Sequence, residues 1–228
     1  MKLKLVVIIP AFNEAPVIGQ VIQDIQQATK ALQPEIVVIN DGSTDATADI
    51  ARKSGAKVFT HRLNRGLGAS LGTGLAYAKL VDADLAVTLD ADGQHHPADI
   101  SQVIQPILAK KADVVIGTRL TSPDGHMPPD RRLINSLSNL LTWILFGVWT
   151  TDSQSGFRAF SRSAINCLQL KTQRMEVSSE IFAEVRRHRL KLAEVPIKVI
   201  YTPYSRRKGQ SSLNAFKVFF KLLLRLAR

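Results

Sequence analysis

The stretch Val87-Thr88-Leu89-Asp90-Ala91-Asp92-Gly93-Gln94-His95 places two carboxylates immediately after an apolar run. The run, residues 85–89, predicts a buried strand. Ligands of open α/β sheets bind at the carboxyl ends of strands, so we expect chemistry at this turn. Two carboxylates separated by one residue repel each other, and a divalent cation with oxygen ligands relieves that repulsion. The alternative is a solvated Asp-Gly turn, and the turn alone does not decide between the two.

Apolar runs alternate with segments of helical spacing through the first half of the chain, which predicts an α/β fold with a mostly parallel, doubly wound sheet. The predicted strands cover residues 3–9, 35–39, 57–60, 85–89 and 112–117, and the predicted helices cover 15–32, 45–53, 66–80 and 97–108. Pro10 is expected to stop the first strand. Ser43 or Thr44 is expected to cap the second helix, and Gly55 to close it.

The pattern is less regular after Arg119. We expect a polar loop (121–132), an apolar core or interfacial helix (133–149), a strand (155–160), a helix (177–189), a strand (192–201), a basic loop (202–212) and a last helix (213–227). No segment has the roughly 20 mostly apolar residues that cross a bilayer. The apolar run after Met1 is too short for a signal peptide, so we expect no cleaved leader, and the lone Cys167 forms no intrachain disulfide. These features predict one cytoplasmic domain.

The net charge of +11 is concentrated at the C-terminal end. Residues 186–228 contain twelve Lys and Arg against the single acidic residue Glu194. This asymmetry suggests contact with a polyanion. Lys217, Lys221 and Arg225 recur at every fourth residue and form a cationic stripe on an otherwise apolar helix, which favours an anionic membrane surface over a helix docked on the domain.

Three predicted strand ends deliver carboxylates to the same edge of the sheet, namely Glu14, Asp41 and the pair Asp90 and Asp92. Such a cleft repels a bare anion. It suits a ligand with hydroxyls and ring nitrogens whose phosphates are neutralised by a metal. A nucleoside diphosphate fits this description: Asp41 can accept from base or ribose, Asp90 can accept from ribose, and Asp92 can hold the metal.

Five motifs occur in an order that resembles the family-2 glycosyltransferases with the GT-A fold, in particular the dolichol-phosphate mannosyltransferases and related polyprenyl-phosphate sugar transferases. They are Pro10-Ala11-Phe12-Asn13-Glu14, Asn40-Asp41-Gly42-Ser43-Thr44-Asp45, Asn64-Arg65-Gly66, Asp90-Ala91-Asp92-Gly93-Gln94-His95 and Asp152-Ser153-Gln154-Ser155-Gly156-Phe157-Arg158. The resemblance covers residues 5–212. It implies a Rossmann-like GT-A catalytic domain (1–212) with helices on both faces of the sheet, followed by a basic amphipathic helix (213–228).

The resemblance also implies roles for matching positions. The nucleotide-sugar pocket would comprise Pro10, Phe12, Glu14, Ile39, Asp41, Arg65, Asp90 and Ala91, with Arg119, Arg131, Arg132, Arg206 and Lys208 as phosphate clamps. Mg²⁺ or Mn²⁺ would be held by Asp90, Asp92 and Gln94, and the acceptor would meet Arg158 and Glu180. Phe12 stands where relatives often have Tyr. Ser212 stands where the mannosyltransferases tend to have Lys, so UDP-hexoses are candidate donors beside GDP-mannose.

The implied reaction is inverting sugar transfer to a polyprenyl phosphate, with Asp92, Arg119 and Asp152 as catalytic residues. The metal at Asp92 and the guanidinium of Arg119 would neutralise the departing diphosphate. Asp152 would be the base for a hydroxyl acceptor, whereas with a phosphate acceptor it would only orient groups. The enzyme would act peripherally at the cytosolic face of the membrane.

Two further hypotheses concern binding, one of nucleic acid and one of a metal by histidines. A nucleic-acid or scaffold protein would use the basic tail, but the carboxylate cleft repels phosphates and the tail's aromatics lie among leucines, so no nucleic-acid partner is expected. Adjacent His95 and His96, without a partner at helical spacing, are predicted as polar turn residues rather than metal ligands.

Overall fold

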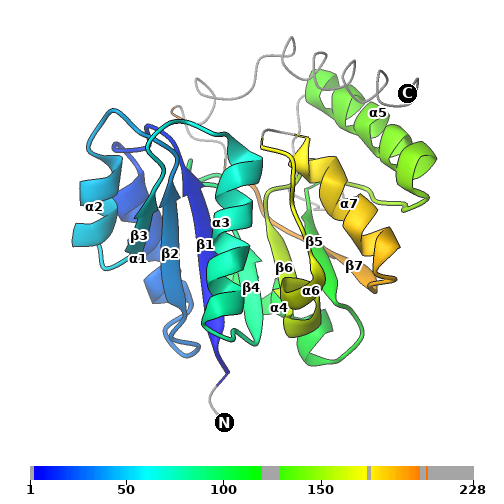
Figure 1. Ribbon diagram of the computed structural model, residues 1–228, viewed down its shortest axis with the longest axis horizontal. Coiled ribbons are helices and arrows are strands. Elements are labelled where there is room, and N and C mark those ends of the chain that lie inside the picture. The colour runs from blue at the N-terminus through cyan, green and yellow to red at the C-terminus, as the bar shows by residue number, and fades with distance from the viewer. Residues whose placement is uncertain (1–2, 120–128, 174–175, 201–203, 205–228) are drawn as a thin grey trace.

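Strands from both halves of the chain join in one seven-stranded sheet of order β3-β2-β1-β4-β6-β5-β7, with helices on both faces (Figure 1). The computed structural model describes residues 3–119, 129–173, 176–200 and 204. The strands are β1 (Leu5–Ala11), β2 (Glu35–Asn40), β3 (Lys57–Thr60), β4 (Leu85–Thr88), β5 (Val114–Thr118), β6 (Arg158–Ser161) and β7 (Leu192–Pro196). The helices are α1 (Ile18–Ala28), α2 (Thr47–Lys53), α3 (Leu67–Leu80), the 3₁₀ turn η1 (Pro97–Asp99), α4 (Ile100–Leu108), α5 (Pro129–Phe146), α6 (Arg162–Cys167) and α7 (Val177–Arg187).

The sheet is parallel except at β6, which runs antiparallel to both β4 and β5. The predicted mostly parallel α/β sheet is therefore confirmed. Because β6 is the one reversed strand, the segment that precedes it arrives at the same edge where the parallel strands end. Residues 152–157 thus meet the turn after β4.

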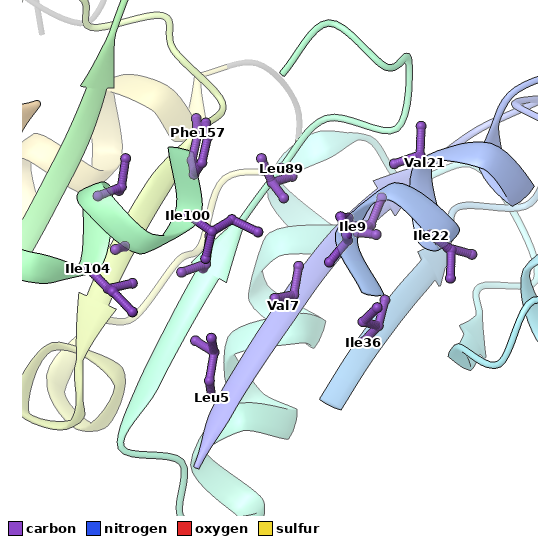
Figure 2. Packing of buried hydrophobic residues seen from close by; sticks show 14 of the residues in the cluster. Leu5, Val7, Ile9, Val21, Ile22, Ile36, Leu89, Ile100, Ile104 and Phe157 are labelled. Atoms are coloured by element: carbon purple, nitrogen blue, oxygen red, sulfur yellow. The ribbon is translucent and has the colours of Figure 1, made fainter. Parts of the chain in front are cut away.

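The apolar core lies on both faces of the sheet. Along β1, Val7 and Ile9 pack on one side with α1 and α4, while Val6 and Ile8 pack on the other side with α3. Figure 2 shows the first of these layers, with side chains from β1, α1 and α4 in contact. A strand covered on both faces carries an unbroken apolar run, which is why the first strand shows no alternation.

Two details of the first half differ from expectation. β1 continues through Pro10 to Ala11, because its pairing with β4 ends at Ile8 and a proline beyond that point costs no ladder hydrogen bond. The predicted Ser43 or Thr44 cap is wrong: α2 begins at Thr47 without a side-chain cap, and Asp45 Oδ1 accepts from the Thr47 backbone N–H instead.

The second half differs more. α5 begins at Pro129 rather than at residue 133, β7 ends at Pro196, and α6 was not predicted. Within the described ranges, no helix combines the length and hydropathy needed to cross a bilayer. The predicted helix 213–227 lies outside the described residues.

Candidate active site

Glu14, which follows β1, lies close enough to Asp90 and Asp92, which follow β4, for their charges to interact. The negative charges of Asp90 and Glu14 both raise the pKa of Asp92. The positive charges of Arg119 and Arg158, which come from the second half of the chain, lower the pKa of Asp90. The structure therefore gathers carboxylates and guanidinium groups at the predicted edge of the sheet.

Asp90 is fixed in place by a histidine and a glycine. Its Oδ2 lies 2.9 Å from Nε2 of His95. A Cβ on Gly156 would lie only 2.3 Å from Asp90 Oδ1, so no larger residue leaves the carboxylate where it is. Burial raises the pKa of Asp90, but the bond to His95 and the nearby positive charges outweigh burial and lower it overall. Asp90 is thus held ionised in one position.

The prediction of a polar turn residue at His95 is wrong, because this residue is buried and forms an isolated β-bridge with Val199. Its side chain is 4% exposed and its ring meets Phe157 edge-on, with centroids 5.3 Å apart. The carboxylate of Asp90 and this aromatic contact fix the ring orientation. The buried imidazole of His95 therefore has a structural role: it positions the Asp90 carboxylate within the site.

Asp92 lies where burial and neighbouring carboxylates disfavour its negative charge. Its Oδ1 accepts from the Gln94 backbone N–H at 3.0 Å. Burial first, and then the charge of Asp90, raise the pKa of Asp92 to about 6. The described residues contain no cluster of three His, Cys, Asp or Glu able to hold a metal alone. The donor set nevertheless fits Mg²⁺ or Mn²⁺, because such ions are bound through one or two carboxylates and complete their shell with substrate phosphates and water.

Asp41 organises the neighbouring turn. Its Oδ1 accepts from His61 Nδ1 at 2.7 Å and from the Arg65 backbone N–H at 2.9 Å, and its Oδ2 accepts from the Gly66 N–H at 2.6 Å. The side chain is 6% exposed. The motif Asn64-Arg65-Gly66 is therefore held against the end of β2 by this one carboxylate.

Arg119 and Asp152 form a bidentate ion pair. Nε of Arg119 donates to Oδ2 of Asp152 and Nη2 to Oδ1, both at 2.7 Å, while the Arg119 backbone N–H donates to Oδ2 at 3.0 Å. Asp152 is fully buried and the Arg119 side chain is 21% exposed. Asp152 therefore sets the direction of the Arg119 guanidinium.

The turn that carries Asp152 is held from two sides. Glu194 on β7 accepts from the Thr151 backbone N–H at 2.7 Å and from the hydroxyls of Thr150 and Thr151. On the other side, Asn139 of α5 donates to Thr151 O at 2.6 Å and accepts from the Ser153 N–H at 2.8 Å. The turn is thus clamped between β7 and α5.

Arg158 lies in the interior behind this pair. Nε donates to Ser155 O at 2.8 Å and Nη2 to Ser153 O at 3.0 Å, while Nη1 has no hydrogen-bond partner among the described residues. Burial lowers the pKa of Arg158 to about 10, although the charges of Asp90 and Asp152 oppose this. The guanidinium thus lies between two carboxylates and lines the small hollow beside Asp90, of about 60 Å³.

The other predicted site residues fall into three groups. Pro10 lines the same hollow, Phe12 is exposed, and Ile39 and Ala91 are buried, Ile39 within the core. Arg65 lines a separate hollow of about 400 Å³ along α3, and Glu180 accepts from the backbone N–H groups of Lys171 and Thr172 beside it. Arg132 is exposed near the start of α5, only the backbone of Arg131 is described, and Arg206 and Lys208 lie outside the described residues.

Sequence reasoning missed His95, Gly156 and Glu194 as parts of the site. Tyr204, whose hydroxyl donates to Glu14 Oε2 at 2.9 Å, was also missed. Gly156 and His95 stood inside motifs that were recognised, so the motifs could have marked them. Glu194 and Tyr204 are distant in sequence from the residues that they contact, and no local pattern marks them.

Comparisons with known proteins identify the family of this chain. Residues 6–169 match the family described as Glycosyl transferase family 2. The chain is 44% identical to a Methanocaldococcus jannaschii protein described as uncharacterized, with 96% of this chain and 90% of the relative covered. It is 38% identical to the UDP-N-acetylglucosamine–dolichyl-phosphate N-acetylglucosaminyltransferase of Methanococcus voltae, with 95% and 94% covered.

A solved structure shows the same fold. Glucosyl-3-phosphoglycerate synthase from Mycobacterium tuberculosis, in complex with Mn²⁺, UDP and glucosyl-3-phosphoglycerate, superposes with a TM-score of 0.70 at 23% identity, over 96% of this chain and 79% of that one. The family match covers the strands and turns that carry Glu14, Asp90, Asp92, Arg119 and Asp152. The chain belongs to glycosyl transferase family 2 and is a glycosyltransferase.

Proposed function

We propose that this glycosyltransferase moves a sugar, with inversion, from a nucleoside-diphosphate sugar to a polyprenyl phosphate, with Mg²⁺ or Mn²⁺ as cofactor and at the cytosolic face of a membrane. Two kinds of similarity support the proposal. The Methanococcus voltae relative is named for transfer from UDP-N-acetylglucosamine to dolichyl phosphate. The structural neighbour holds Mn²⁺ and UDP.

The observation that carries the choice of acceptor is the state of Asp152. A hydroxyl acceptor must lose its proton to a base within hydrogen-bond reach. Asp152 is fully buried and both of its oxygens accept from Arg119, which supports a role in orienting that guanidinium over a role as the base for an acceptor hydroxyl. A phosphate monoester has its second pKa near 6 and is mostly dianionic at neutral pH, so it needs no base.

The bonds in the proposed step balance without a proton transfer. An oxygen of the acceptor phosphate attacks the anomeric carbon opposite the diphosphate, and the bond from that carbon to the donor's phosphate oxygen breaks. The nucleoside diphosphate leaves with the electron pair. The metal, held by Asp92 with Asp90 and Gln94, would supply charge neutralisation at the donor diphosphate when bound.

The protein's own residues supply positioning and charge. Arg119, directed by Asp152, would place positive charge beside the departing diphosphate. Asp90, held by His95, would accept from the ribose of the donor. Glu14 and Asp41 lie at the ends of the neighbouring strands, where the nucleoside would bind. Arg206 and Lys208 remain proposed phosphate clamps, as do Arg131 and Arg132.

The test compares two acceptors that differ only in their phosphate. Purified protein receives UDP-N-acetylglucosamine, UDP-glucose or GDP-mannose with Mg²⁺ or Mn²⁺, together with a polyprenyl phosphate or the matching polyprenol, and products are read by mass spectrometry. We expect transfer to the phosphate and none to the alcohol. Transfer to the alcohol, or to neither lipid with any donor, would overturn the proposal.

Asp152→Asn distinguishes the two candidate roles of this residue, positioning of Arg119 and general base. As a positioning residue, its loss should slow transfer to polyprenyl phosphate by about tenfold to a hundredfold while leaving the pH profile of the reaction unchanged. If Asp152 were a general base, the substitution would remove the acidic limb of that profile. Arg119→Lys, which keeps the charge and loses the bidentate geometry, should slow the reaction to a similar extent.

A further inference from the structure

Helix α5 carries apolar side chains on its outer face. Leu133, Leu137, Leu140 and Ile144 recur at spacings of four, three and four residues, so they share one side of the helix. They are 71%, 39%, 43% and 56% exposed. An exposed apolar stripe of this length on a family member that handles lipid calls for a physical reason.

The inner face of the same helix is largely polar, although it includes the buried Leu141. Asn135, Asn139 and Thr142 recur at spacings of four and three, and all three are buried. Asn139 exchanges hydrogen bonds with the turn that carries Asp152, as described above, and Asn135 Nδ2 also reaches Thr151 O, at 3.4 Å. Buried polar residues thus lie beside Leu141 on the inner face while four apolar residues face outward, and the hydrogen bonds of Asn139 fix this orientation. Rotating the apolar stripe inward would leave buried backbone groups unpaired, at about 1–3 kcal/mol each.

Both tryptophans of the chain belong to this surface. Trp143 and Trp149 are 50% and 65% exposed, and their rings meet edge to face with centroids 6.4 Å apart. Tryptophan is enriched at membrane–water interfaces, where its ring is apolar and its N–H remains hydrated. We call the set Leu133, Leu137, Leu140, Trp143, Ile144 and Trp149 the α5 outer face.

Arginines border the α5 outer face. A hollow of about 900 Å³ beside the end of α5 is lined by Trp149, Arg186 and Arg189. Arg132 is exposed at the other end of the stripe. An apolar centre with a cationic rim is the pattern that binds an anionic lipid surface, since apolar groups enter the headgroup boundary while cations meet lipid phosphates.

We propose that the α5 outer face is a docking surface for an anionic phospholipid membrane. The inference deepens the proposed function and rests on it for the need to reach a membrane lipid. In Figure 1, α5 lies at the periphery, on the side of the molecule where the parallel strands end. Because Asn139 ties α5 to the Asp152 turn, docking holds Arg119 close to the plane of the lipid phosphates. The sequence favoured membrane contact by the helix 213–227 and left residues 133–149 as a core or interfacial helix, and α5 is thus a second, separate element.

Tryptophan fluorescence of the full-length protein tests docking directly, because the only two tryptophans lie on the proposed surface. Vesicles of phosphatidylcholine with about one-third phosphatidylglycerol should shift the emission to shorter wavelength. Lipids brominated near the headgroup should quench it. Vesicles of phosphatidylcholine alone should give a weaker effect. If a second copy or another segment of the chain covers this face in solution, the emission will already be blue-shifted and insensitive to vesicles, and the proposal fails.

A charge-matched pair of variants locates the contact. Leu133→Glu with Ile144→Glu should lower vesicle binding at least about tenfold, since two exposed apolar side chains can no longer enter the interface. Leu80→Glu with Leu108→Glu adds the same charge at exposed apolar positions on α3 and α4, and should lower binding much less. Equal losses in the two variants would show a general charge effect and overturn the assignment.

Activity distinguishes failure of this inference from failure of the proposed function. With a short, water-soluble polyprenyl phosphate, the Leu133→Glu, Ile144→Glu variant should match the wild type, while with acceptor in vesicles it should be slower by the factor lost in binding. Unchanged activity on vesicles would refute docking by α5 and leave the proposed function intact. Binding to vesicles without transfer to any polyprenyl phosphate would refute the proposed function and leave docking by α5 intact.

Discussion

The turn after β4 and the turn before β6 each present an aspartate to the same site, and the two differ in how their charge is balanced. Asp92 lies near Asp90 and Glu14, and burial and these charges raise its pKa to about 6. Asp152 is more deeply buried, yet Arg119 meets both of its oxygens. The first turn retains an electrostatic repulsion that a cation can relieve, whereas the second is already neutralised and serves as a scaffold.

The largest expected effect concerns the first turn. Asp92→Ala should lower the rate of sugar transfer by about a thousandfold, equivalent to about 4 kcal/mol, because the site loses the carboxylate that we propose as its main metal ligand. Steady-state kinetics with saturating Mg²⁺ or Mn²⁺ measure this. Asp49→Ala, at an exposed position on α2, is the control and should match the wild type. Full activity of Asp92→Ala in the presence of a chelator would refute the metal role.

In the second turn, the turn before β6, a substitution of Asp152 should mainly affect the stability of the fold. Asp152→Asn removes the charge that compensates Arg119, and breaking a buried ion pair in this way should lower the free energy of unfolding by about 3 kcal/mol. Denaturant unfolding followed by circular dichroism measures the loss. An unchanged free energy of unfolding would show that this carboxylate does not act as a scaffold.

Gly156 connects the two turns, and a methyl group there should separate activity from stability. In Gly156→Ala the new Cβ would displace the Asp90 carboxylate, which is the movable end of a side chain. We expect about a hundredfold loss of transfer rate with little change in melting temperature. Gly72→Ala is the matched control, because its nearest contact would be an ordinary 3.9 Å. Comparable rates in both variants would contradict the close approach.

The smallest expected effect is on the free energy of unfolding, which should rise in Asp92→Asn although it falls in Asp152→Asn. The folded-state pKa of Asp92 lies above its ordinary value, so the protonated form stabilises the fold and this contribution is lost as the pH rises through about 6. Asp92→Asn retains a neutral side chain at every pH. In metal-free protein it should therefore raise the free energy of unfolding by about 2 kcal/mol at pH 7 and by little at pH 4. Thermal melts at the two pH values measure this, and a loss at pH 7 would refute the repulsion.

Much of the first half of the fold could be predicted from sequence because its signals are local. The apolar runs before Asn40 and Asp90 are strands covered on both faces, and such runs stand out against polar turns. The carboxylates Asp41, Asp90 and Asp92 follow those strands directly, so the strand ends placed them at one edge. The burial of His95 was harder to interpret, because it depends on contacts with Asp90 and with the distant Phe157.

The second half could not be predicted to the same extent, because its contacts join distant segments. Arg119 and Asp152 are 33 residues apart, and β6 is short and reversed. The spacing of apolar residues in α4 and α5 is similar, and both segments read as amphipathic helices. α4 buries its apolar side against the core, whereas α5 leaves Leu133, Leu137, Leu140 and Ile144 exposed, because the Asp152 turn offers hydrogen bonds to Asn139 on its inner face.

Sequence alone thus determined the order of strands and helices in the first half and the carboxylates at their ends, since both follow from local periodicity and chain direction. Tertiary structure decided which charges are compensated and which remain exposed to repulsion, and which side of α5 faces water. Those outcomes depend on distances between segments far apart in the chain, which no local pattern of residues encodes.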